Sequence, residues 1–137
     1  MTRIATPDQR AAALAYFRTR EGGPSLAEQE RRVAMAAEAH GFTISNRLIE
    51  VAQIGTSDMT DRRVKLFELL AEAQGGSART VVIGGADAIG ENPVEAAIVA
   101  VMLERSGCRV LFGDGFDPSL HREQADRIVA GEFELPG

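Results

Sequence analysis

Short apolar segments typical of buried strands alternate along this chain with longer segments that have the apolar spacing of helices. Thr80–Gly84 is the clearest strand, because its β-branched run fits a position that is buried on both faces of a sheet. Ser25 and Glu28 form a capping box at the start of a helical pattern that Gly41 ends. Because strands that alternate with helices pair in parallel, we predict an α/β fold with a mostly parallel four-stranded sheet and helices on both faces.

The expected order of elements is β-α-β-α-β-α-β-α. The strands are expected at residues 11–18, 42–51, 80–84 and 109–112. The helices are expected at residues 25–40, 61–73, 92–105 and 117–129. In the second helix, Val64, Phe67 and Leu70 are expected to face the core. The predicted division of the chain is a polar arm at residues 1–10, an α/β domain at residues 11–115, and a short C-terminal helix and tail at residues 116–137.

The composition favours a single soluble domain. The chain has 137 residues, of which 45% are hydrophobic, and its net charge of −5 favours neither nucleic acid nor an anionic membrane as a partner. The segment Met1–Arg10 lacks the apolar core of a signal peptide, and the longest apolar run, Ala96–Leu103, is too short to cross a bilayer. The lone Cys108 fits a reducing compartment. We therefore expect a cytoplasmic protein that binds no membrane.

The sequence contains no motif for a metal or a cofactor. Neither His40 nor His121 has the spacing of a metal-ligand set. The glycines of the Gly84–Gly90 turn do not form a dinucleotide fingerprint, although a phosphate-binding role for this turn is an alternative. Asp87 and Glu91 oppose that alternative by their charge. We expect neither a metal nor a cofactor.

The stretch Ala11–Arg20 is an apolar run that ends in an aromatic pair and two arginines. Residues two apart on a strand share a face, so Tyr16, Arg18 and Arg20 would lie together at the carboxyl end of the first strand. Ligands bind at this end of the strands in open α/β sheets. Buried arginines need an anion, a carboxylate or water beside them. We interpret this edge as a binding site or as the remnant of one.

The chain resembles the catalytic domain of the serine recombinases, the resolvase and invertase family, over residues 11–115. The resemblance depends on several spaced pieces, whose order along the chain matches the family. These pieces are Tyr16 with Arg18; Ser25, Leu26 and Gln29; Gly55 and Thr56; Asp61 and Arg62; and Asp87, Ile89 and Gly90.

The resemblance implies a function in DNA recombination. In the family, a serine that lies two residues after the first arginine attacks a DNA phosphodiester, and several arginines stabilise the charge on the phosphate. Arg18 and Arg62 match two of these arginines, Glu50 stands where the family usually has an aspartate, and Asp87 matches the aspartate of an aspartate-arginine pair. The resemblance therefore implies a set of remnant active-site positions. This set is Tyr16, Arg18, Arg20, Glu50, Arg62 and Asp87.

The chain departs from the family at the positions that carry the chemistry. Arg20 stands at the position of the nucleophilic serine, and a guanidinium stays protonated and cannot act as a nucleophile. Ala88 and Glu91 stand where the family has two further arginines, and Pro24 replaces a glutamine. After the fourth strand, where the family has a long dimerisation helix and a DNA-binding domain, we expect only a short helix and a tail. We predict no catalytic residue and no DNA cleavage.

Two interpretations of the arginines stay open. Arg18 and Arg20 bind an external anion, or they pair with Glu50 and Asp87 inside the protein. The Glu28–Arg32 run is expected to be a solvated face of the first helix.

The third helix is apolar almost all round. In one interpretation it is sandwiched between the sheet and the C-terminal segment, and in the other it forms a dimer or partner interface. The candidate interface residues are Ile98, Val99, Val101, Met102 and Leu103.

Three functions follow from these observations. The first is a catalytically inactive serine-recombinase-like domain that acts as a protein-interaction or dimerisation module, with a protein partner or a second copy of itself. The second is an accessory DNA-recombination factor with weak, residual DNA binding. The third is a small-molecule or phosphate-binding α/β protein, since a fold does not fix a function.

Overall fold

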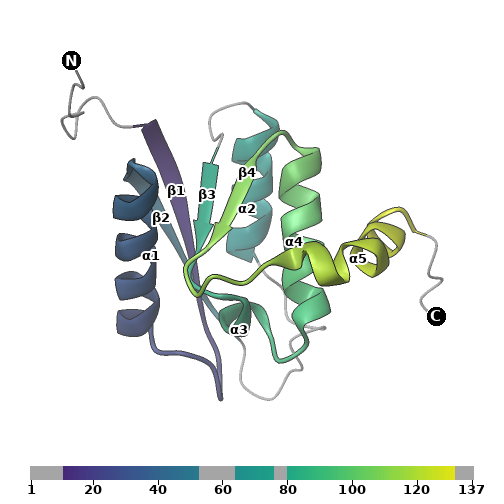
Figure 1. Cartoon of the computed structure of the whole chain (residues 1–137), viewed down its shortest axis with the longest axis horizontal. Coiled ribbons are helices and arrows are strands. Elements are labelled where there is room, and N and C mark those ends of the chain that lie inside the picture. The colour runs from purple at the N-terminus through teal and green to yellow at the C-terminus, as the bar shows by residue number, and fades with distance from the viewer. Residues whose placement is uncertain (1–10, 53–63, 76–79, 132–137) are drawn as a thin grey trace.

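The computed structural model describes residues 11–52, 64–75 and 80–131. Its centre is a single sheet with the strand order β2-β1-β3-β4, and every neighbouring pair is parallel (Figure 1). The strands are β1 (Ala11–Thr19), β2 (Phe42–Val51), β3 (Thr80–Ile83) and β4 (Arg109–Phe112). The predicted four-stranded parallel sheet is confirmed.

Helices cover both faces of the sheet, as predicted (Figure 1). The helical elements are α1 (Leu26–His40), α2 (Val64–Gln74), α3 (Ala86–Ile89), α4 (Pro93–Arg105), the 3₁₀-helix η2 (Pro118–His121) and α5 (Arg122–Val129). One core lies between α1 and the sheet and includes Phe17, Val33 and Val82. The larger core lies between the sheet and the pair α2 and α4. Among the described residues, no helix combines the length and the apolar character needed to cross a membrane.

The predicted helix caps are confirmed. The Ser25 hydroxyl accepts the backbone N–H of Glu28 at 3.1 Å, and Gly41 ends α1 in the left-handed conformation with a φ of 73°. Asn92 caps α4 by accepting the N–H of Val94 at 3.0 Å. These local signals explain why the bounds of α1 and α4 were predictable.

The register of β1 and β2 determines which side chains meet at the carboxyl edge. The pairing shifts by one residue after Ala13, whose carbonyl accepts the Ser45 hydroxyl at 3.2 Å. Beyond this bulge, Tyr16 lies opposite Leu48, and Arg18 lies opposite Glu50. Two of the predicted site residues therefore stand on neighbouring strands at one edge.

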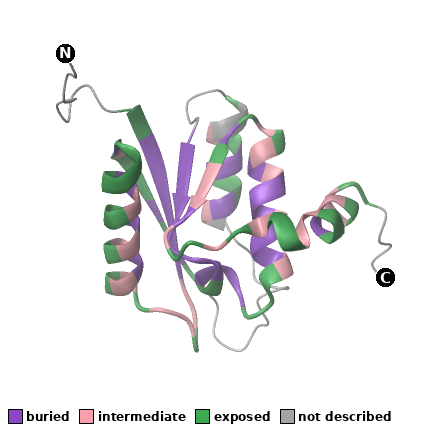
Figure 2. Ribbon diagram, viewed as in Figure 1, coloured by how far each residue is buried: buried purple, intermediate pink, exposed green. Residues whose placement is uncertain are grey.

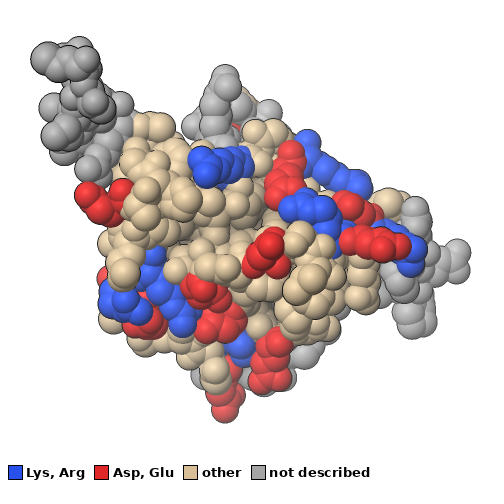
Figure 3. All heavy atoms as spheres, in the orientation of Figure 1, with Lys and Arg blue, Asp and Glu red and all other residues tan. Residues whose placement is uncertain are grey.

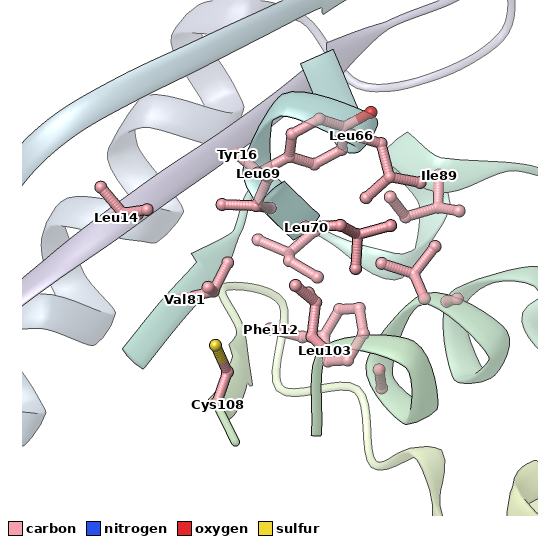
Figure 4. Packing of buried hydrophobic residues seen from close by; sticks show 14 of the residues in the cluster. Leu14, Tyr16, Leu66, Leu69, Leu70, Val81, Ile89, Leu103, Cys108 and Phe112 are labelled. Atoms are coloured by element: carbon pink, nitrogen blue, oxygen red, sulfur yellow. The ribbon is translucent and has the colours of Figure 1, made fainter. Parts of the chain in front are cut away.

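Two sequence predictions need correction. The Gly84–Gly90 segment, which we expected to be a turn, contains the short helix α3. Phe67 was predicted to face the core, but 64% of it is exposed. The buried face of α2 is instead Leu66, Leu69 and Leu70, which share one side of the helix by their spacing of three and four residues (Figure 4). The side chain of Val64 lies outside the described residues.

Helix α4 lies between the sheet and the C-terminal segment (Figure 2). Val99 and Leu103 pack in the larger core, while Val101 packs against α5. Ile98 and Met102 are half-buried. The structure therefore agrees with the sandwiched interpretation for three of the five candidate interface residues. The domain boundary at residue 115 remains a prediction.

The two faces of α2 generate a stability prediction. We expect Leu69→Ala to lower the free energy of unfolding by about 2–5 kcal/mol, because Leu69 is fully buried and its truncation leaves a cavity. We expect Phe67→Ala to change it by about 0.5 kcal/mol or less, as for most surface substitutions. Urea unfolding followed by circular dichroism measures both values. Equal losses in the two variants would contradict this orientation of the helix.

Candidate functional site

A pocket of about 400 Å³ lies at the carboxyl ends of the strands, beside α3. It combines one arginine with three carboxylates and has no hydroxyl or thiol side chain among its lining residues in the described part of the chain. The lining residues are Arg20, Ala86, Asp87, Gly90, Glu91, Pro93 and Asp114. In Figure 3, acidic and basic side chains alternate over this part of the surface instead of forming a continuous basic patch.

Tyr16 and Glu50 form a buried hydrogen bond between β1 and β2. The Tyr16 hydroxyl donates to Oε1 of Glu50, and Oε2 of the same carboxylate accepts the backbone N–H of Lys65 at 2.9 Å. Lys65 lies in the first turn of α2, where the helix dipole also favours a negative charge. Glu50 therefore connects two strands to the helix that follows them.

Arg18 is fully buried and does not line the pocket. Its Nη1 donates to the carbonyl oxygen of Ile89 at 2.8 Å and to that of Ala88 at 3.5 Å. Its backbone N–H donates to Oε1 of Gln29 at 3.1 Å. This arginine is bonded to the carboxyl end of α3, which carries the partial negative charge of a helix terminus.

Arg20 lies at the exposed edge of the site. Its Nε donates to the carbonyl oxygen of Asp87 at 2.9 Å, and its Nη1 donates to that of Glu21 at 3.3 Å. A guanidinium that is bonded to the backbone of α3 therefore occupies the position at which the resemblance implies a nucleophilic serine.

Asp87 pairs with Arg32, a residue that the sequence analysis did not place in the site. Arg32 Nη1 lies 2.8 Å from Asp87 Oδ1, and Nη2 lies 3.2 Å from Oδ2, so the contact is made at two points. The hydrogen bond to Asp87 raises the pKa of Arg32, against the opposing effect of burial. The expectation of a solvated face was wrong for Arg32, which follows the buried Gln29 by three residues and shares its side of α1.

Asp114 is a second residue that sequence reasoning missed. Its Oδ2 accepts the N–H of Ala86 at 3.1 Å, and its Oδ1 accepts the N–H of Phe116 at 3.2 Å. Asp114 thus holds the start of α3 against the loop after β4. The Asp-Gly pair Asp114-Gly115 signals a turn in the sequence, but not this contact.

Glycines at the ends of β3 and β4 bring α1 close to the sheet. A Cβ atom at Gly84 would lie 2.4 Å from Oε1 of Gln29, and one at Gly113 would lie 2.8 Å from Cβ of Arg32. The space beside these glycines is filled by side chains of α1. This packing argues against the phosphate-binding alternative for the Gly84–Gly90 turn.

The structure brings together all the predicted site residues except Arg62, which lies outside the described residues, as do Gly55, Thr56 and Asp61. Arg18 and Arg20 donate to backbone carbonyl oxygens of α3, while the carboxylate of Asp87 pairs with Arg32 and that of Glu50 accepts hydrogen bonds from Tyr16 and Lys65. The choice between an external anion and the carboxylates as partners of the two arginines stays a prediction. Within the described ranges, no group of three histidine, cysteine, aspartate or glutamate side chains is placed to hold a metal ion.

The family described as "Resolvase, N terminal domain" matches residues 13–134. The chain belongs to the resolvase family. A search of curated proteins gave no match. Among solved structures, this resolvase-family domain is similar to a resolvase family site-specific recombinase from Streptococcus pneumoniae, at 15% identity and a TM-score of 0.62, over 90% of this chain and 88% of that one.

Two further solved structures share the fold. The N-terminal catalytic domain of TP901-1 integrase is 19% identical, with a TM-score of 0.61 over 88% of this chain and 95% of that one. The C-terminal catalytic domain of ISC1926 TnpA, an IS607-like serine recombinase, is 19% identical, with a TM-score of 0.57 over 88% of this chain and 82% of that one. The resemblance to the serine recombinases is confirmed, while the roles of the individual site residues remain predictions.

The Arg32–Asp87 contact generates a prediction of stability. We expect Arg32→Ala to lower the free energy of unfolding by about 1 kcal/mol, because the half-exposed Asp87 loses a two-point partner that solvent partly replaces. A double-mutant cycle with Asp87→Ala measures the coupling between the two residues. Arg31→Ala is the matched control, because Arg31 is exposed and pairs with Glu28 on its own helix. A coupling free energy of zero between Arg32 and Asp87 in this cycle would contradict the contact.

Proposed function

We propose that this resolvase-family domain does not cleave DNA and acts in recombination by binding protein, either a partner or a second copy of itself. The observation that carries the proposal is the position of Arg20. It occupies the place of the nucleophile in the family resemblance, and its Nε is bonded to the carbonyl oxygen of Asp87. A serine hydroxyl at this place would have the required chemistry, but a guanidinium does not.

The surrounding charges support the same proposal. Arg18 is buried beneath α3 and bonded to Ile89, so its guanidinium does not line the pocket that a phosphate would enter. The charge of Asp87 is balanced by Arg32. Ala88 is fully buried, and Glu91 adds a negative charge to the pocket. Stabilising the transition state of a phosphoryl transfer requires positive charge at this point.

A second candidate function is that of an accessory recombination factor that contacts DNA weakly. The half-buried guanidinium of Arg20, which lines the pocket, favours it. The net charge of −5 and the three carboxylates around that guanidinium oppose it. These opposing charges rank DNA binding below protein binding.

The first prediction from the proposal concerns covalent chemistry. We expect neither the natural protein nor Arg20→Ser to form a covalent adduct with a labelled DNA duplex or a nicked duplex, because the hydroxyl restored by the substitution still lacks cations at Ala88 and Glu91. Denaturing gel electrophoresis detects such an adduct, and an active serine recombinase with its own site is the positive control. An adduct that forms with the natural protein would overturn the proposal.

The second prediction concerns DNA affinity. We expect fluorescence anisotropy to detect no binding of a labelled duplex at about 0.15 M salt, where screening leaves only contacts with several phosphates effective. The measurement is repeated at lower salt with Arg20→Ala and with Arg31→Ala, an exposed arginine of α1 away from the pocket. Binding that falls steeply with salt and is lost only in Arg20→Ala would favour the accessory factor instead.

A further inference from the structure

Helix α5 covers a face of α4 that differs from the face in the larger core. The contact centres on Ala97 and Val101 of α4 and Ala125 of α5, which form a small apolar cluster of their own. Ala97 and Val101 lie on one side of α4, because they are four positions apart. In Figure 1, α5 lies beyond α4 at the margin of the molecule. The structure therefore shows both an apolar surface on α4 and the helix that occupies it.

Two ion pairs join α5 to the last turn of α4. Nη2 of Arg122 donates to Oε1 of Glu104 at 3.1 Å, and Nη1 bonds to the other oxygen of the same carboxylate. Nη2 of Arg105 lies 3.6 Å from Oδ1 of Asp126. The four side chains are between 33% and 51% exposed, so water reaches both pairs. Ion pairs of this kind determine the position of a helix but hold it only weakly.

The helix itself has few other supports. It has eight residues, and an isolated helix of this length is not stable in water. In α5, all of which the structure describes, Ala125 is the only buried residue, and its side chain is a single methyl group. Segments with few buried apolar contacts open locally before the rest of a protein unfolds. Undocking and unfolding of α5 are therefore one event, and it is separable from the sheet and its two cores.

We propose that α5 is a displaceable cover, and that the face of α4 beneath it binds an amphipathic helix of a protein partner. This inference rests on the proposed protein-binding function and assigns its surface. With α5 docked, Ala97 and Val101 are at most 2% exposed, and the partner has no access to them. The partner competes with α5 for one surface, so its affinity depends on the fraction of molecules in which α5 is open.

The residues of α5 define the chemistry of that partner. Arg122, Ala125 and Val129 follow one another at spacings of three and four, so they share one side of the helix. A partner helix with a basic residue, then a small and an aliphatic residue at the same spacings, would meet Glu104 and the apolar cluster in the same way.

Ile98 gives a partner its advantage over α5. This residue packs against the cluster but stays half-buried beside α5. A longer partner helix would bury more of Ile98 than the eight residues of α5 do. A second copy of α5 would make only the contacts that each chain already makes for itself, which favours a different protein as the partner.

Hydrogen exchange followed by mass spectrometry tests the cover. We expect the amides of α5 in the natural protein to exchange at least about tenfold faster than those of β1. We expect Arg122→Glu to speed exchange in α5 about tenfold further, with β1 unchanged, and Glu104→Arg combined with Arg122→Glu to restore protection. Arg127→Glu is the matched control, since Arg127 pairs with Glu123 inside α5. Exchange of α5 as slow as that of β1, or equal effects of the two single substitutions, would overturn the cover.

A helix-stabilised peptide tests the surface. The probe is a labelled peptide of residues 117–131 with a lactam bridge between Glu123 and Arg127→Lys, two exposed positions of α5. The bridge removes much of the entropic cost of ordering a short helix. By fluorescence anisotropy, we expect the peptide to bind Arg122→Glu protein about tenfold more tightly than the natural protein, because the chain's own α5 competes less. Equal affinities, or no binding to Arg122→Glu protein, would overturn this surface.

The two proposals fail in different ways. A peptide that does not bind, together with the absence of a DNA adduct, would overturn the surface on α4 and leave the proposed loss of cleavage in place. A covalent adduct between the natural protein and DNA would overturn the proposed function whatever α5 does.

Discussion

The fully buried guanidinium of Arg18 requires hydrogen-bond acceptors inside the protein, and the carboxyl edge of the sheet supplies them. Removing such a charge from water costs on the order of several kcal/mol unless polar partners replace the solvent. The carbonyl oxygens at the end of α3 are such partners. The position of α3 depends in turn on Asp114 at its start and on the contact between Asp87 and Arg32. A short helix between β3 and α4 thus becomes part of the support for a buried charge.

Glu50 is a second buried charged residue at this edge. It lies on β2, which neighbours β1 on the side away from β3. Its carboxylate is buried, and it accepts hydrogen bonds from Tyr16 and from the first turn of α2. The two buried charged groups lie opposite each other on neighbouring strands, yet each has bonds of its own to a different helix. The carboxyl edge of this resolvase-family domain is therefore cross-linked by polar contacts between elements that are distant in sequence.

Much of the fold was predictable because its signals are local. The strands β2 and β4 have the bounds that their apolar patterns predict, and the caps Ser25 and Asn92 were identified from residue type and spacing. The orientation of α2 was wrong at Phe67, because several apolar residues of this helix allow more than one choice of buried face. The tertiary structure decides between such choices.

The site was less predictable because its bonds join distant segments. Arg32 and Asp87 are 55 positions apart, and no local pattern links a helical arginine to a helix that was itself expected to be a turn. Asp114 is similar, because its bond to Ala86 depends on the side-by-side ends of β3 and β4. The family resemblance identified Tyr16, Arg18 and Glu50 as neighbours, but their bonds to α2 and α3 required the structure.

The close approach of α1 at Gly84 and Gly113 is a steric requirement of the fold. It is distinct from the hydrogen bonds that the charged residues make at the carboxyl edge. The distance between the helix and the sheet is limited by atomic size at these glycines, and Gly113 faces the Cβ and backbone of Arg32, not its charged end. Replacing the charged end of Arg32 would therefore leave this steric limit in place, although the hydrogen bonds of its guanidinium to Gly84 and Asp87 would be lost. The spacing of helix and sheet is thus limited by the absence of a side chain at two positions, whereas the charged residues of the edge act through hydrogen bonds that are additional to this limit.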